Sequence, residues 1–164
     1  MKQYQNTFMG IEVNFPGSWN FRYWGNRLDK SSIPKTHQSN FEDLPSDKNP
    51  EKVLVTSISR HTSGSIILRS IFEIVALYRP TGIDLQSEIP IDASEISRRF
   101  GTDEVAANHA RFMHIEKQGE GFIRYMRCYY WQVHPEIWLA CIVSGSSLEQ
   151  FNEALSILGF VRRI

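Results

Sequence analysis

The hydrophobic residues near the start of the chain recur at every second position. Ile11, Val13 and Phe15 are apolar, and the residues between them are polar. This period is that of a β-strand with one buried face, and the Pro-Gly pair that follows ends it. The aromatic segment 18–24 comes next. We expect it to pack against this strand or to form a second short strand.

Residues 53–78 are rich in β-branched side chains. Two apolar runs, 53–59 and 66–78, flank the segment 61–65, whose serines and glycine are typical of a turn. We therefore predict a β-hairpin whose second strand ends before Pro80. A helix over 66–78 is the alternative, but the high Ile and Val content favours a strand.

The segment 92–109 has a helical pattern. Asp92 and Glu95 have the spacing of a capping box, and apolar residues follow at helical spacing. This pattern predicts a short helix that ends at Gly101. A second short helix is predicted over 102–109, because acidic residues near its start would interact favourably with the helix dipole.

The last third of the chain predicts a three-stranded meander and a helix. Apolar residues and turn signals predict strands over 110–118, 122–133 and 136–144. The turns between them are the Gly-Glu-Gly and His-Pro segments. Two serines then precede the segment 148–158, in which leucines and a phenylalanine keep helical spacing. We therefore expect the meander to be followed by an amphipathic helix.

The predicted hairpin of the last two strands has two chemically different faces. If its turn is centred on residues 134 and 135, Cys128 lies opposite Cys141. One face is then mostly aliphatic and sulfur-bearing and forms core. The other face combines aromatic side chains with an arginine, a composition typical of binding hot spots. The candidate partner-binding residues on this face are Tyr125, Arg127, Tyr129, Trp131 and Trp138.

This aromatic face has a second interpretation. Aromatic pairs across neighbouring strands stabilise a sheet by themselves. A sheet that is covered by helices on both sides also carries aromatic residues on both faces, and an arginine can lay its stem along them. The residues alone leave both interpretations open.

The composition is that of one globular domain. The chain has 164 residues, of which 41% are hydrophobic and 22% are charged. These values predict a single domain that spans residues 1–164. A long polar loop is predicted at about residues 25–52, a region with three prolines and no periodicity.

Charge and hydropathy narrow the classes of partner. The chain has 18 basic and 18 acidic residues and no net charge, whereas proteins that bind nucleic acid usually carry a basic excess. The first residues lack the apolar run of a signal peptide. No apolar stretch approaches the ~20 residues of a membrane-spanning helix. We expect a cytoplasmic protein that binds neither nucleic acid nor membrane.

No motif in the chain indicates a particular chemistry. The five histidines do not show metal-ligand spacing, and the signatures of zinc proteases, P-loops and nucleophile elbows are absent. Cys128 is expected in the middle of a strand on the apolar face, where a thiol is normally inert. Cys128 and Cys141 are expected to stay reduced in the cytoplasm. We therefore expect no metal, no cofactor and no catalytic residue.

Three segments resemble a known fold family. Residues 10–19 look like an opening strand with a Pro-x-x-Trp ending, 121–146 like a central meander, and 148–158 like a closing helix. In this order they resemble the PsbP/Mog1/DcrB-like fold. The resemblance implies an α+β fold, in which an antiparallel β-sheet is flanked by helices, and mostly non-catalytic binding roles.

The members of that family narrow the expected role. They include photosystem accessory subunits, a small-GTPase-binding nuclear import factor and bacterial effector chaperones of type VI secretion. The chain lacks the acidic motif of the import-factor branch and the targeting segment of the photosystem and lipoprotein branches. The resemblance therefore implies a small bacterial protein that binds another protein.

These observations predict a non-catalytic protein-binding module. The first interpretation is a bacterial cytoplasmic immunity protein that neutralises a toxin or effector. The second is an effector-delivery chaperone of a secretion system. The alternative from another class is a small-ligand-binding or hydrolytic domain with a pocket between sheet and helix, which a pocket holding His109 or His114 beside a carboxylate would favour. The third interpretation is a homodimer that pairs through the aromatic face.

Overall fold

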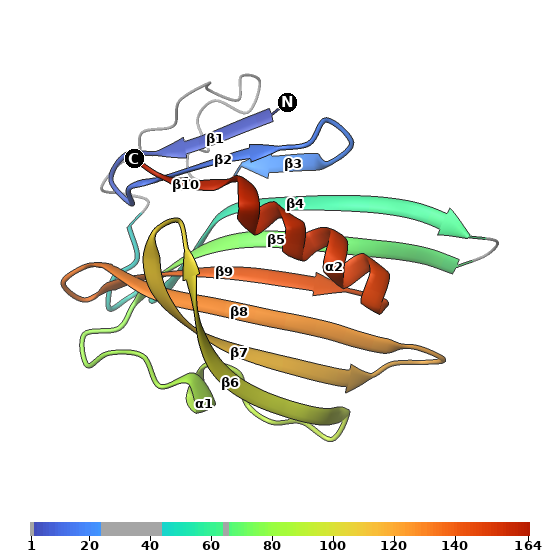
Figure 1. Cartoon of the computed structure of the whole chain (residues 1–164). Helices are drawn as coiled ribbons and strands as arrows, with labels where there is room; N and C mark the ends of the chain where they lie inside the picture. The colour runs from blue at the N-terminus through green and yellow to red at the C-terminus, as the bar shows by residue number, and fades with distance from the viewer. Residues whose placement is uncertain (1, 24–43, 64–65) are drawn as a thin grey trace.

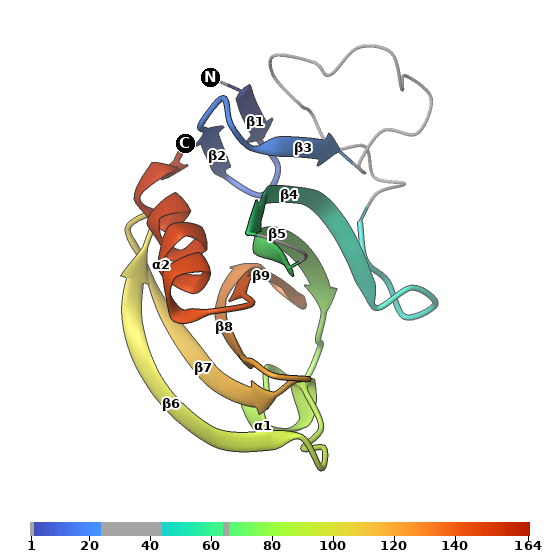
Figure 2. The ribbon, with the colours of Figure 1, turned by 90° about the vertical axis from the view of Figure 1, so that its right-hand side faces the viewer.

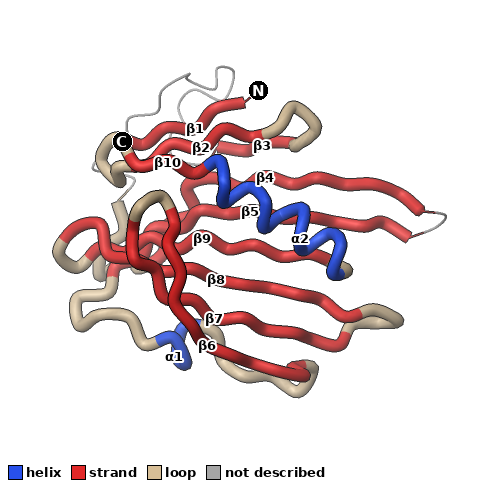
Figure 3. Tube along the Cα trace, viewed as in Figure 1, coloured by secondary structure: helices blue, strands red, loops and turns tan. Residues whose placement is uncertain are grey.

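The computed structural model describes residues 2–23, 44–63 and 66–164. Within these ranges the chain forms two antiparallel sheets, one three-stranded and one seven-stranded, with few helices (Figures 1 and 3). The fold is therefore mixed α+β, as predicted, and it is dominated by its sheets. Most of the predicted polar loop at 25–52 lies outside the described residues.

The small sheet has the order β1-β2-β10, with the strands β1 (Lys2–Asn6), β2 (Ile11–Phe15) and β10 (Val161–Arg163). The large sheet has the order β3-β4-β5-β9-β8-β7-β6. Its strands are β3 (Asn20–Tyr23), β4 (Glu51–Ser63), β5 (Ile66–Tyr78), β6 (Glu95–Val105), β7 (Asn108–Gln118), β8 (Ile123–His134) and β9 (Ile137–Gly145). The helices are α1 (Leu85–Glu88), α2 (Leu148–Ser156) and the 3-10 helix η2 (Ile157–Phe160).

The large sheet is strongly curved, and α2 lies on its concave side (Figure 2). We call this side the inner face and the opposite side the outer face. The inner face packs Phe72 of β5 and Tyr129 of β8 into one core with Phe151 of α2 and Phe15 of β2. A smaller core on the outer face lies beneath Leu85 of α1. The two faces are therefore buried to different extents, and the inner one holds most of the core.

The C-terminal helix confirms its prediction. Ser147 caps α2, because its hydroxyl oxygen accepts a hydrogen bond from the Gln150 N–H at 3.2 Å. Phe151 and Ala154 are the buried side chains that face the sheet. The Ser70 hydroxyl of β5 lies 2.9 Å from the Gln150 side-chain oxygen, which adds a polar link between helix and sheet. Strands at 110–118, 122–133 and 136–144 are also confirmed within one or two residues.

The two helices predicted between residues 96 and 109 are wrong. The segment forms the hairpin of β6 and β7, closed by Ala106 and Ala107, which have φ values of 51° and 60°. Two successive residues with positive φ form the type I′ turn that suits a two-residue hairpin. The apparent capping box has other partners: Asp92 accepts from the Ser94 N–H at 2.9 Å, and Glu95 forms an ion pair with Arg98.

The predicted register of the last hairpin is also wrong by one residue. Tyr129 lies opposite Cys141 and Trp131 opposite Leu139, because the turn is formed by Pro135 and Glu136 and not by residues 134 and 135, and because the strand has a bulge between Gln132 and His134. A shift of one residue moves side chains to the opposite face of a sheet. Trp138 therefore belongs to the outer face, whereas Tyr129 and Trp131 belong to the inner face.

The same shift separates the two cysteines. Cys128 lies in the core of the outer face and Cys141 in that of the inner face, and both side chains are fully buried. Burial raises the pKa of the Cys128 thiol to about 12 and raises that of Cys141 as well. Both are free thiols, so the expectation of reduced cysteines agrees with the geometry, although the residues are not opposed.

We predict that neither cysteine reacts with a thiol reagent in the folded protein. The protonated, buried thiol is a poor nucleophile, so Ellman's reagent should give no absorbance change at neutral pH. The same reagent in denaturant should titrate both thiols. Rapid modification of one cysteine in the native protein would contradict the placement of these strands.

Candidate anion-binding site

The five predicted partner-binding residues do not form one surface. Tyr129 and Trp131 are 1% and 3% exposed and belong to the inner core. Tyr125 and Arg127 are partly exposed on the same face, whereas Trp138 is partly exposed on the outer face. The prediction that these five residues share one face is therefore wrong. Tyr129 and Trp131 are too deeply buried to contact a partner.

Arg127 contacts four side chains inside the protein. Its guanidinium lies over the rings of Phe112 at 4.9 Å and Phe151 at 5.5 Å. Its Nε–H donates to His114 Nδ1 at 3.2 Å, and its Nη1–H donates to the Tyr129 hydroxyl oxygen at 3.1 Å. Arg127 therefore joins β7, β8 and α2, and its role in this geometry is to hold the helix on the sheet.

His114 is held neutral beside this arginine. Its ring is 5% exposed, and burial is the main cause that lowers its pKa, followed by the positive charges of Arg127 and Arg99. The carboxylate of Glu116, 3.5 Å from His114 Nε2, acts in the opposite direction. A neutral His114 can accept the Arg127 N–H, which an imidazolium cannot.

We predict that His114 makes the protein less stable in mild acid. As the pH falls below the ordinary histidine pKa of 6.5, the unfolded chain binds a proton that the folded chain does not. The free energy of unfolding therefore falls until the pH passes the lowered pKa of His114. Urea denaturation of the wild type and of His114→Gln should show that their difference shrinks from about pH 7 to about pH 5. A constant difference would contradict the lowered pKa.

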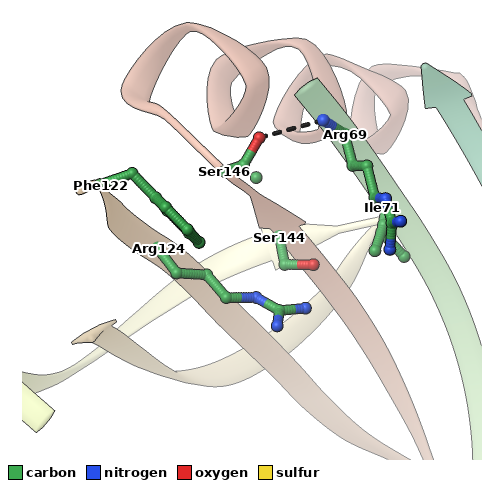
Figure 4. Close-up of a pocket in the computed structure, with 7 residues that line it drawn as sticks. Arg69, Ile71, Phe122, Arg124, Ser144 and Ser146 are labelled. Carbon is green, nitrogen blue, oxygen red and sulfur yellow. Dashed lines mark hydrogen bonds between the residues drawn. The ribbon is translucent and has the colours of Figure 1, made fainter. Parts of the chain in front are cut away.

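A pocket of about 180 Å³ opens where β5, β9 and β8 meet the start of α2. It is lined by Arg69, Ile71, Phe122, Arg124, Ser144, Gly145 and Ser146. The guanidinium groups of Arg69 and Arg124 lie on either side of the Ser144 hydroxyl in Figure 4. We call this pocket the two-arginine pocket.

The walls of the two-arginine pocket are fixed by backbone pairing. Ile71 of β5 and Met126 of β8 are both paired with Ser144 of β9, so these three strands hold the pocket at one end of the outer face. The Arg69 N–H donates to the Ser146 hydroxyl at 3.0 Å, and the Ser146 N–H donates to the Arg69 carbonyl at 3.2 Å. The segment that leads into α2 is thereby tied to β5.

The two arginines of this pocket have no ion-pair partner among the described residues. Arg69 and Arg124 are exposed, and neither guanidinium forms an ion pair or hydrogen bond with any other described residue. The acidic group that interacts with Arg124 is Glu73 on β5; burial raises the Glu73 pKa, and a hydrogen bond from Thr56 and the charge of Arg124 partly offset this. Two guanidinium groups with serine hydroxyls between them are donors suited to a carboxylate or a phosphate.

A second, larger depression of about 580 Å³ lies between α1 and the β6–β7 hairpin. Its polar groups are already used: Asp84 accepts from the Gln86 N–H at 3.1 Å, and Arg111 donates to the Ile83 carbonyl at 2.8 Å. Neither His109 nor His114 lines this depression or the two-arginine pocket. The pocket that would favour a hydrolytic domain is therefore not found at either place.

The two-arginine pocket has no signature in the sequence. Its residues come from three strands, and Arg69, Arg124 and Ser144 stand far apart in the chain. The one local signal is Arg69, which interrupts the apolar run of 66–78. Only the register of β5, β9 and β8 brings these residues together.

Comparisons with known proteins show the fold and no more. No family model matches this chain, and no curated protein matches it. Among solved structures, the crystal structure of LpqN, a protein involved in cell envelope biogenesis of Mycobacterium tuberculosis, is similar with a TM-score of 0.51 at 9% sequence identity. The match covers 93% of this chain and 82% of that chain. The resemblance to the PsbP/Mog1/DcrB-like fold stays a prediction.

No helix in the described ranges is long and apolar enough to cross a membrane. Those ranges also contain no group of three or more His, Cys, Asp or Glu residues that could hold a metal ion.

Proposed function

We propose that this protein is a non-catalytic protein-binding module and that its two-arginine pocket receives an acidic side chain of the partner. The observation that carries the proposal is the pair Arg69 and Arg124, exposed at a small pocket and without an ion-pair partner among the described residues. An arginine fork binds a carboxylate through two parallel hydrogen bonds. A partner aspartate or glutamate would thus give the two arginines an ion-pair partner.

The size and lining of the pocket favour a protein partner over a free small ligand. Pockets for drug-sized ligands measure roughly 300–1,000 Å³, whereas this one measures about 180 Å³. One large aromatic side chain lines the pocket beside the two arginines: Phe122, which is 43% exposed. Exposed aromatic and arginine side chains are enriched at protein interfaces.

The cellular role that we propose is that of a bacterial cytoplasmic immunity protein, which neutralises a toxin or effector by binding it. An effector-delivery chaperone of a secretion system is the second role, since it would use the same kind of surface. A non-catalytic role agrees with the two buried thiols, whose raised pKa values make them poor nucleophiles.

A hydrolytic domain has one observation in its favour. His114 lies beside Glu116, an arrangement that general bases use. However, His114 Nδ1 already accepts the Arg127 N–H, and the ring is 5% exposed. We therefore favour the binding module.

Affinity purification of the tagged protein from its native host, followed by mass spectrometry, tests the proposal. We expect one stoichiometric partner that is lost with Arg69→Ala/Arg124→Ala and kept with Arg163→Ala, an exposed arginine of β10. With the purified partner, Arg124→Ala should weaken binding by about tenfold or more. Added salt should weaken the wild-type complex more than that of the double variant.

Two results would count against the proposal. A partner that the double variant binds as well as the wild type does would mean that the pocket is not the anchor. If no partner is recovered, and inorganic phosphate or acetate raises the melting temperature of the wild type but not of the double variant, the pocket serves a small anion instead.

A further inference from the structure

Strand β6 is at one edge of the large sheet, and the backbone edge that points away from β7 pairs with no other described strand. The β6–β7 turn has two residues, so the flanking pair Val105 and Asn108 exchanges both backbone hydrogen bonds. Because such pairs alternate, Arg99, Gly101 and Asp103 direct their backbone groups toward β7. The even-numbered residues, from Arg98 to Glu104, direct theirs outward.

A hydrogen bond supports this assignment. The Glu104 N–H donates to the side chain of its own neighbour Asp103 at 2.8 Å, and not to β7. An outward-facing N–H at a sheet edge is otherwise open to another strand. The free edge of β6 therefore offers a row of backbone donors and acceptors.

The charges along this edge are self-complementary. When two copies of β6 run antiparallel, outward residues must meet outward residues, so the allowed registers differ by steps of two. One of them places Gly101 opposite Gly101 of the second copy. Arg99 then lies opposite Asp103 of the second copy, and the two-fold symmetry repeats this pair.

This register also gives the charges their closest approach. Arg99 and Asp103 occupy positions between the backbone hydrogen bonds, where opposed side chains lie nearest. Both are exposed and form no ion pair with any described residue. A step of two in either direction places Arg99 opposite Gly101 or opposite Val105 of the second copy and loses the pair. Arg98 does not contribute, because it is bound to Glu95 and to the Ile89 carbonyl.

Apolar side chains at the same edge add to the contact. Phe100 is 45% exposed, and in this register the two copies of Phe100 become diagonal neighbours across the symmetry axis. Ile96 in the same strand is 52% exposed. An edge strand with exposed apolar side chains is a template for pairing with another strand.

We propose that two copies of this chain pair through β6, antiparallel, with Gly101 opposite Gly101, so that the large sheet continues across the dimer. The contact lies on other strands than the two-arginine pocket of β5, β8 and β9, so the inference does not depend on the proposed function. The occupant of the edge is a second copy because the edge complements its own charges.

Charge reversal of the full chain tests the proposal by light scattering after size exclusion. The wild type should show a mass near twice 19.0 kDa, and Arg99→Asp and Asp103→Arg should each weaken the dimer by about 30-fold, since attractive pairs become repulsive twice over. The double variant Arg99→Asp/Asp103→Arg should dimerise again. An equimolar mixture of the two single variants should form a heterodimer, because each then supplies the charge that the other needs.

The outcomes separate the alternatives. Circular dichroism should show that each variant keeps the fold. A wild type that stays monomeric up to about 1 mM would overturn the proposal. A dimer that neither reversal weakens would place the contact on another surface. If both reversals weaken the dimer but neither the double variant nor the mixture restores it, the pairing between Arg99 and Asp103 is wrong.

Discussion

Replacing Gly145 by alanine is expected to lower the free energy of unfolding by about 3 kcal/mol and the melting temperature by roughly 6–12 °C. Gly145 is the last residue of β9, and it is paired with Ser70 of β5 and with Tyr125 of β8. A Cβ atom at this position would overlap the backbone of Phe151 and Gln150 in α2. Backbone atoms cannot yield as a side chain can, so α2 would have to leave its place on the inner face.

Gly159→Ala is the matched control for this prediction. Gly159 has no atom within 4 Å of an added Cβ and no positive φ, so its substitution should change the stability by less than about 1 kcal/mol. Urea denaturation followed by circular dichroism measures both variants. Equal stability of the two would mean that α2 does not pack against Gly145 as described.

Replacing Arg127 by alanine is expected to cost about 3 kcal/mol as well. The substitution empties the space between Phe112 and Phe151 and leaves His114 Nδ1 and the Tyr129 hydroxyl without their donor. An unpaired buried acceptor keeps its desolvation cost. Arg127→Lys should recover only part of the loss, because an ammonium group lacks the planar fork that reaches both acceptors.

The control for this prediction is another arginine of β8, and a second measurement is the pKa of His114. Arg124→Ala, an exposed arginine of β8, should change the stability by less than about 0.5 kcal/mol. In Arg127→Lys the positive charge remains, whereas in Arg127→Ala it is lost, so the pKa of His114 should rise only in the alanine variant. Histidine NMR signals followed against pH report that pKa. An Arg127→Ala variant as stable as the wild type would contradict the structural role of this arginine.

The elements that could be predicted from the sequence are those with strong local signals. The alternation of β2, the β-branched run of β5 and the capped α2 depend on neighbouring residues alone, and all three were predicted. The segment that became β6 lacks such a signal, because an edge strand with exposed side chains loses its two-residue alternation. Its partner β7 decides its structure, and that pairing is not a local property.

The candidate site depends on register, which the sequence does not display. The bulge between Gln132 and His134 shifts the pairing of β8 and β9 by one residue, and this single shift moves Trp138 and separates Cys128 from Cys141. The same kind of information brings Arg69 beside Arg124. Tyr129 and Trp131, predicted as contact residues, are core, whereas the exposed arginines are isolated in their segments.

The strand order of the small sheet determines when this sheet can form during synthesis. Val13 of β2 pairs with Tyr4 on one side and with Val161 on the other. As the ribosome delivers the chain, β1 and β2 can meet at once, but a two-stranded ribbon is marginal in water. Its third strand appears only after the whole large sheet has been translated. Ile11 and Phe15 of the nascent ribbon therefore stay exposed during translation. The pairing of β10 with β2 belongs among the last steps of folding.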